Sequence, residues 1–175
     1  MDETTRFRPL RRRKQALSAQ LCEEILRRGT SGVLALAGDG GYPYAVPMSY
    51  AFDGGKLYFH CAHEGHKLDA IRREPKASFC VIDRDTVVPE EYTTYFRSVI
   101  AFGRLRTIED EAQKRAAIAQ LARRYFPQDS EGNRAHAIGR EWAGLCMLEM
   151  EIEHISGKEA IELARERAGQ GRDGQ

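Results

Sequence analysis

The sequence contains no apolar run approaching the ~20 residues that a membrane-spanning helix needs. Its N-terminus also lacks the apolar segment of a signal peptide, and its four cysteines show neither CxxC spacing nor the density of a secreted disulfide scaffold. We therefore expect a cytoplasmic protein that does not insert into membranes, in which the cysteines are small buried hydrophobic residues.

An excess of charge of one sign is missing as well, since the formal net charge is only +1. The positive excess is confined to residues 1–14, which hold six basic residues against two acidic ones. No P-loop motif of the form GxxxxGK[ST] occurs either. We interpret residues 1–17 as a basic N-terminal arm and expect neither nucleic acid nor a membrane as a partner.

What the sequence does contain is a series of short apolar runs separated by turn signals. The turns GDGG and DGG predict three antiparallel strands between residues 33 and 61. Further strands are expected at 77–82, 98–108 and 145–155, and helices at 18–29, 66–74 and 109–126. Two segments without a clean period, 83–97 and 128–140, are expected to be a loop and a polar linker.

Six strands with short helices at the corners and no βαβ alternation favour a mainly β protein with peripheral helices, built as a small antiparallel barrel. The domain is expected to span residues 18–163, followed by a polar tail at 164–175. Pro43 and Pro47 lie in or beside the second strand. Because proline cannot donate to a ladder, that strand is expected at an edge or with a bulge.

The segment YFHCAHEGHKLDAI, residues 58–71, is rich in histidine and allows three interpretations. His60, His63 and His66 with Cys61 have the ligand types of a zinc or copper site, but strand alternation opposes their convergence. Alternatively, Gly65 precedes a helix that begins with His66 and Lys67, and its free N–H groups could bind a phosphate. An ordinary strand-to-helix corner with solvated side chains is the third possibility.

The apolar neighbourhood favours the phosphate interpretation. VPMSYAF and LYFHC are expected to pair as a hairpin, which would set Met48, Ser49 and Tyr50 opposite Tyr58, Phe59 and His60. An apolar wall that ends in an anion pocket suits a phosphorylated planar cofactor, although aromatic side chains that point inward would belong to the barrel core.

Five motifs occur in an order that resembles a known family. VPMSY, YFHCA, GHKLDAI, YFRSV and SGKE follow one another along the chain, and the resemblance covers about residues 6–162. The sequence resembles the flavin-binding split-barrel proteins related to pyridoxamine 5′-phosphate oxidase, and within them the nitroimidazole-resistance subgroup. The resemblance implies a six-stranded antiparallel split β-barrel that forms a homodimer with FMN at the subunit interface.

The resemblance also implies a set of cofactor contacts. Pro47, Met48, Ser49 and Tyr50 would line the isoalloxazine, mostly through backbone; Tyr58, Phe59, His60 and Cys61 would follow the ribityl chain and ring; His66 and Lys67 would hold the phosphate; Arg97 and Ser98 would meet the flavin; and Trp142 and Lys158 would reach it from the second subunit.

Two positions depart from the family pattern. His66 replaces a common arginine, so phosphate affinity is expected to fall as an imidazole of ordinary pKa near ~6.5 loses its proton. Cys61 replaces a common serine or threonine, which removes a hydroxyl contact.

The implied function is that of an FMN-dependent oxidoreductase. It would take electrons from NAD(P)H or another donor and reduce a small planar oxidant such as a nitroaromatic compound, for example a nitroimidazole, or a quinone. His60 is the expected catalytic residue, and no metal is expected. The segments 83–97, with Glu90, Glu91, Tyr92 and Tyr95, and 128–140 are expected to shape the substrate end of the pocket.

Two alternatives remain open at this point. The chain could be a non-catalytic module that binds FMN or haem for storage or sensing. Pyridoxamine 5′-phosphate oxidation is the less favoured enzyme activity, because the C-terminal segment offers little beyond Arg140 for a second phosphate site.

Overall fold

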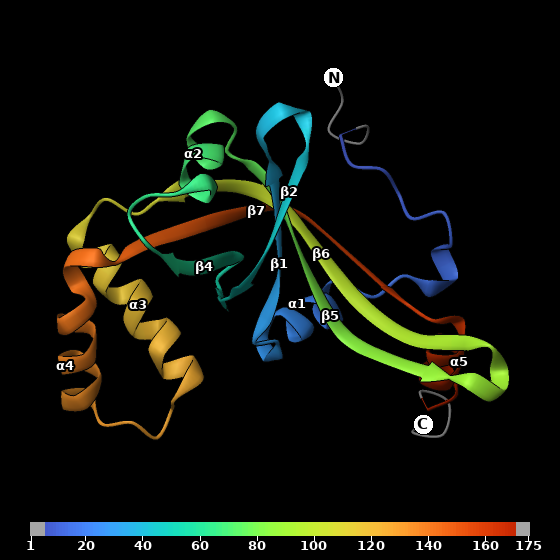
Figure 1. Cartoon of the computed structure of the whole chain (residues 1–175). Coiled ribbons are helices and arrows are strands. Elements are labelled where there is room, and N and C mark those ends of the chain that lie inside the picture. Colours follow the sequence, from blue (N-terminus) through green and yellow to red (C-terminus); the bar gives the residue numbers. More distant parts are fainter. Residues whose placement is uncertain (1–5, 171–175) are drawn as a thin grey trace.

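The computed structural model describes residues 6–170, and its central element is an antiparallel sheet of seven strands within that range (Figure 1). The strands are β1 (Ser31–Ala37), β2 (Pro43–Ser49), β3 (Ala51–Asp53), β4 (Lys56–Cys61), β5 (Lys76–Val88), β6 (Thr93–Thr107) and β7 (Cys146–Glu159). They are arranged in the order β2-β1-β5-β6-β7-β4-β3. The mainly β architecture with peripheral helices is confirmed, but the expected count of six strands is one too low.

The extra strand arises at Tyr50, which alone separates β2 from β3. These two strands are neighbours in the chain, yet they stand at opposite ends of the strand order. The sheet must therefore curl until its two ends meet at Tyr50. No ladder joins β2 to β3 or β4 in the described part of the chain, so the barrel is split rather than closed.

The expected hairpin between the second and third strands is therefore wrong in part. β2 pairs with β1 along its whole length, whereas β4 pairs with β3 and β7. Met48 and Ser49 belong to the β1 ladder and are not cross-strand partners of Phe59 and His60. The prediction of an edge strand at the two prolines is confirmed, because β2 is the last strand on its side of the sheet.

The segment 83–97 is not a loop. β5 and β6 continue through it as one long hairpin, and residues Pro89–Glu91 form a single turn of 3-10 helix at its tip. A register shift between Ile82 and Arg84 places Asp83 at an irregularity of the ladder. The sequence shows no alternation of apolar and polar residues here because neither face of this part of the hairpin is buried in the core: its residues are exposed or half-buried.

Five α-helices surround the sheet in the described range: α1 (Ala19–Arg28), α2 (His66–Arg73), α3 (Glu111–Tyr125), α4 (Glu131–Glu141) and α5 (Ile161–Gln170). Ser18 caps α1 as predicted, by accepting a hydrogen bond from the Leu21 N–H. The expected linker at 128–140 is largely helix α4, which Ser130 caps in the same way. Residues 164–170 of the expected tail continue helix α5, and residues 171–175 lie outside the described residues, as do residues 1–5.

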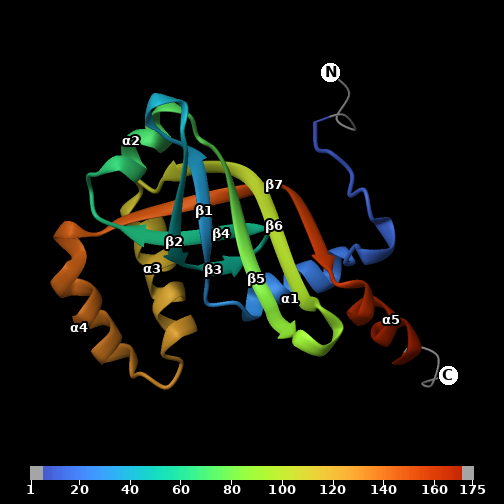
Figure 2. The ribbon, with the colours of Figure 1, turned by 45° about the vertical axis from the view of Figure 1, so that its right-hand side comes forward.

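Four of the five helices lie in two places around the sheet, and α2 lies beside β1. Figures 1 and 2 both show α3 and α4 side by side near β4, while the β5–β6 hairpin extends toward α1 and α5. The barrel interior holds the main core, which includes Ile25 and Leu26 of α1 together with Phe59 and Phe79 of the sheet. A second, smaller cluster packs under α3 around Ala117 and Met147.

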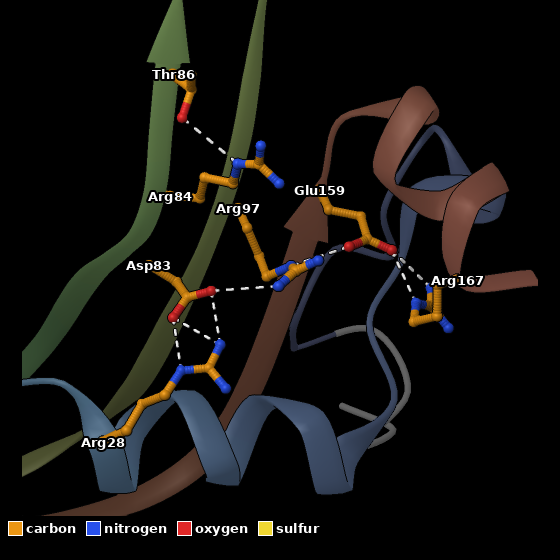
Figure 3. A network of polar contacts seen from close by, with 7 residues as sticks. All are labelled: Arg28, Asp83, Arg84, Thr86, Arg97, Glu159 and Arg167. Atoms are coloured by element: carbon orange, nitrogen blue, oxygen red, sulfur yellow. Dashed lines mark hydrogen bonds and ion pairs between the residues drawn. The ribbon is translucent and has the colours of Figure 1, made fainter. Parts of the chain in front are cut away.

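A chain of ion pairs joins the hairpin to α1 and α5 (Figure 3). Arg28 donates to both carboxylate oxygens of Asp83, at 2.8 and 2.7 Å, and Arg97 lies between Asp83 and Glu159. The side chain of Glu159 is completely buried and also accepts two hydrogen bonds from Arg167, at 2.9 and 2.7 Å. The buried carboxylate therefore depends on two guanidinium groups for its hydrogen bonds.

We expect Glu159→Gln to lower the free energy of unfolding by about 3 kcal/mol, because the substitution removes the buried charge that both arginines pair with. Urea denaturation monitored by circular dichroism would measure this. Arg84→Gln is a matched control on the same hairpin, since Arg84 is exposed and makes no ion pair, only a 3.4 Å contact with Thr86 and a contact with the ring of Tyr95. Equal unfolding midpoints for Glu159→Gln and Arg84→Gln would contradict the assigned role of Glu159.

Candidate functional site

Strand alternation divides the predicted cofactor contacts between two faces of the sheet. Met48, Tyr50 and Phe59 point into the barrel and belong to its buried core. Pro47, Ser49 and His60 are exposed on the opposite face. Because side chains alternate along a strand, only every second residue of β2 and β4 can present its side chain to a ligand outside the barrel.

An apolar cavity of about 350 Å³ opens on this outward face, between the sheet and helices α3 and α4. We call it the α3–α4 cavity; it is lined by Ser49, His60, Ile118, Leu121, Ala122, Tyr125, Ala137, Ile138, Glu141 and Leu145. Its volume lies within the range of small-ligand pockets. Ser49 and His60 are the two predicted site residues that line it.

The helical walls of this cavity were missed by the sequence-based set of contacts. Ala137 and Ile138 of α4 lie in the segment 128–140, which was expected to shape the substrate end of the pocket but to do so as a linker. Glu141, the last residue of α4, lies just outside that segment. The segment 83–97 contributes no residue to the α3–α4 cavity. The apolar face of α3 was recognisable from its periodicity. It would have predicted a wall of the cavity only if the position of β4 in the sheet had also been known.

Tyr125 fastens the end of α3 to the sheet beside the cavity. Its hydroxyl accepts the backbone N–H of Tyr50 at 3.0 Å and donates to the carbonyl of Thr30. Arg124 adds hydrogen bonds to the carbonyls of Arg28 and Gly29. The α3 wall is therefore held at the corner where the two ends of the sheet meet.

The start of α2 provides a corner suited to an anion. Gly65 adopts φ 123° and ψ 169°, a region that is essentially restricted to glycine, and no side chain caps the first turn of the helix. Free first-turn N–H groups and the positive end of the helix dipole attract a phosphate. Lys67 lies in the same turn and is half-buried.

The structure places His66 beside the turn between β1 and β2. Its ring stacks on Tyr44, with 4.1 Å between the ring centroids, and its Nε2 lies 3.3 Å from an Asp39 carboxylate oxygen. Arg73 contacts the same carboxylate at 2.8 Å. The side chain of His66 thus already has partners within the chain, and the Leu68 N–H donates to the carbonyl of Gly65. The Lys67 side chain and the N–H groups of residues 66 and 67 are left to bind an anion at this corner.

Cys61 lies next to this corner. The register of β4 and β7 places it opposite Cys146, and both thiols are free. Burial, and to a lesser extent the neighbouring Cys146, raises the pKa of the Cys61 thiol to about 11, although the Lys67 ammonium opposes the shift. The thiol is therefore neutral at physiological pH. It adds no negative charge that would repel a phosphate at the start of α2.

The remaining predicted contacts do not line the α3–α4 cavity. Arg97 is held between Asp83 and Glu159, and Lys158 lies over the ring of Phe96, in register with Ser98. Trp142 donates its indole N–H to Glu111, and the cations of Lys114 and Arg115 each lie 4.3 Å from its ring centroid. Tyr58 is half-buried in the cluster under α3.

The histidines of residues 58–71 do not converge. His60 lines the α3–α4 cavity, His63 lies in the following loop, and His66 faces Asp39. Among residues 6–170, no group of three or more His, Cys, Asp or Glu side chains could hold a metal ion.

No described helix is both long and apolar enough to cross a membrane.

A family model described as pyridoxamine 5′-phosphate oxidase matches residues 18–159. The match covers most of the chain, so the chain belongs to the pyridoxamine 5′-phosphate oxidase family. A comparison with curated proteins finds no match.

Solved structures share the fold. One is described as a 5-nitroimidazole antibiotic resistance protein from Bacteroides thetaiotaomicron, with 20% identity, a TM-score of 0.68, and coverage of 82% of this chain and 86% of the other. An FAD-binding protein from Mesorhizobium loti is 26% identical, with a TM-score of 0.62 and coverage of 83% and 97%. An FAD- and haem-binding protein from Mycobacterium smegmatis is 24% identical, with a TM-score of 0.67 and coverage of 84% and 73%.

The residues of this chain fit a phosphorylated planar cofactor in part. The apolar walls beside Ser49 and His60 suit a ring, and the uncapped first turn of α2 with Lys67 suits a phosphate. The side chains of Tyr50, Phe59 and Trp142 are already engaged in packing and hydrogen bonds and could contribute only through their backbone.

We expect Cys61 to react slowly with alkylating reagents near pH 8, and faster as the pH approaches about 11, because the thiolate is the nucleophile. Lys67→Ala should slow the reaction further, since Lys67 lowers the pKa of this thiol. Short pulses of iodoacetamide followed by peptide mass spectrometry would measure labelling at each cysteine. Labelling of Cys61 at pH 8 as fast as that of a free thiol would show that the assigned environment is wrong.

Proposed function

We propose that this protein is an FMN-dependent oxidoreductase that reduces small planar oxidants, such as nitroimidazoles and other nitroaromatic compounds or quinones, with NAD(P)H as the electron donor. The α3–α4 cavity is the observation that carries this proposal, because it combines apolar walls with one exposed histidine at its edge. Membership of the pyridoxamine 5′-phosphate oxidase family and the fold shared with FAD-binding proteins support a flavin.

The chain's own residues would bind the cofactor and exclude water. Lys67 and the first-turn amides of α2 would hold the phosphate, and the outward face near Ser49 and His60 would support the ring. Bound FMN would supply hydride or electron transfer. The apolar side chains of α3 and α4 would keep water away from the reacting atoms.

His60 is the proposed catalytic residue. It is exposed on β4 and lines the α3–α4 cavity, so its imidazole can reach an oxidant held there. We assign it the donation of a proton or a hydrogen bond to the substrate as that substrate is reduced. Ser49 lines the same cavity and can position a polar substituent through its hydroxyl.

We expect His60→Ala to bind FMN but to lower kcat about 100-fold with a nitroimidazole, because a positioned acid typically contributes such a factor. Oxidation of NAD(P)H, followed by absorbance, would measure turnover, and the flavin absorption band would report cofactor retention. His63→Ala is a matched control, since His63 does not line the α3–α4 cavity. Full turnover by a flavin-loaded His60→Ala protein would remove this role.

A homodimer forms part of this proposal. Arg97, Ser98 and Lys158 lie on β6 and β7 and do not line the α3–α4 cavity, so any contact of theirs with the cofactor would come from a second copy. The β5–β6 hairpin also exposes apolar side chains: Val87 is 67% and Tyr92 98% exposed. Burial of such a surface favours association.

We expect Val87→Glu to weaken the dimer, because the substitution places a charge on the exposed apolar hairpin. Sedimentation equilibrium across a concentration series would measure the change as at least a tenfold rise in the dissociation constant, about 1.4 kcal/mol. Asp85→Asn is a control in the same strand, since Asp85 is already polar and exposed. A monomeric wild-type protein at every concentration would contradict the dimer.

A non-catalytic flavin- or haem-binding module is the second candidate, favoured by the likeness to the FAD- and haem-binding protein. The visible spectrum of the purified protein separates these cases, because a flavin band and a haem Soret band are distinct. A flavin-loaded protein that does not oxidise NAD(P)H in the presence of any nitroaromatic compound or quinone would favour a carrier or sensor.

A further inference from the structure

Glu141 is an acidic residue on the wall of an apolar cavity. It is the last residue of α4 and lines the α3–α4 cavity beside Ile118, Leu121 and Ile138. Its side chain is also exposed to solvent, so the carboxylate is accessible to a ligand that enters the cavity.

Within the described part of the chain, no basic side chain neutralises this charge. Glu141 forms no ion pair with any cation of residues 6–170. It also stands at the C-terminal end of its helix, where the helix dipole disfavours a negative charge. Glu131 at the other end of α4 is different, because the dipole favours it and it lies 3.4 Å from Arg123. Helix stability therefore does not explain the acid at position 141.

The other polar groups of the cavity leave Glu141 available to a ligand. The Tyr125 hydroxyl is already bonded to the Tyr50 N–H and the Thr30 carbonyl. His60 and Ser49 project from the sheet, whereas Glu141 projects from α4. A planar ring between these walls would meet the carboxylate on its helical side.

We propose that the α3–α4 cavity selects planar aromatic molecules that carry a positive charge, and that Glu141 is the residue that determines this preference. The inference rests on the proposed function, in which the same cavity receives the oxidant. The carboxylate attracts a cationic ring and repels an anionic one, and the apolar walls strengthen this interaction because they lower the local dielectric. Oxidants of the N-alkylpyridinium or cationic nitroheterocycle class fit this description.

The experiment compares two probes of nearly the same shape, 1-methylnicotinamide, which is a cation, and nicotinamide, which is neutral. Isothermal titration of the purified wild-type protein should show about fivefold tighter binding of the cation, the upper range for one exposed charge pair. Glu141→Gln should bring the two affinities within about twofold, by weakening only the cation. Glu131→Gln is the control, because it removes the same charge from the same helix without touching the α3–α4 cavity.

Four results would each overturn the inference: equal affinities in the wild-type protein, a preference that persists in Glu141→Gln, a preference that is lost equally in Glu131→Gln, or absence of binding by both probes. The proposed function fails separately, through absence of flavin or of turnover, because the titration needs neither. A flavin-loaded, active protein without charge preference would leave the reductase proposal intact and remove only the role of Glu141.

Discussion

The arrangement of the whole molecule depends on how Tyr50 is held. This residue joins the two strands at opposite ends of the sheet order, so its position sets the curl of the barrel. Its hydroxyl donates to the carbonyl of Leu26 at 2.7 Å, its backbone N–H donates to Tyr125, and its ring packs edge-on against Phe79 at 4.9 Å. Burial raises the pKa of the Tyr50 hydroxyl, which keeps it a neutral donor. One residue thus fixes α1, α3 and both edges of the sheet.

The candidate site follows from this corner. Because Tyr50 points into the barrel, Ser49 on one side of it must point outward, and alternation along β4 turns His60 to the same face. Tyr125 holds the end of α3 against that face. The apolar walls and the titratable side chain are therefore brought together by the same contacts that curl the sheet. The contacts of Tyr50 and Tyr125 therefore determine both the curl of the sheet and the shape of the candidate site.

The sequence allowed the mainly β architecture, the Ser18 cap and the edge position of β2 to be predicted, because each depends on local chemistry. It did not reveal helix α4, whose only buried residue is Arg134, since its helical state depends on a cap and on packing against α3. Nor could it assign the faces of β2 and β4, because a face depends on the register with strands far away in the chain. This is why Tyr50 and Phe59 were expected at a ligand and lie in the core.

We propose that the outward face of β2 and β4 and the start of α2 form one flavin site. A crystal structure of the protein grown with FMN tests it most directly. The account predicts the isoalloxazine against the outward face at Ser49 and His60, and the phosphate at the first turn of α2 beside Lys67. Flavin bound at any other surface, or no flavin density at saturating FMN, would contradict it.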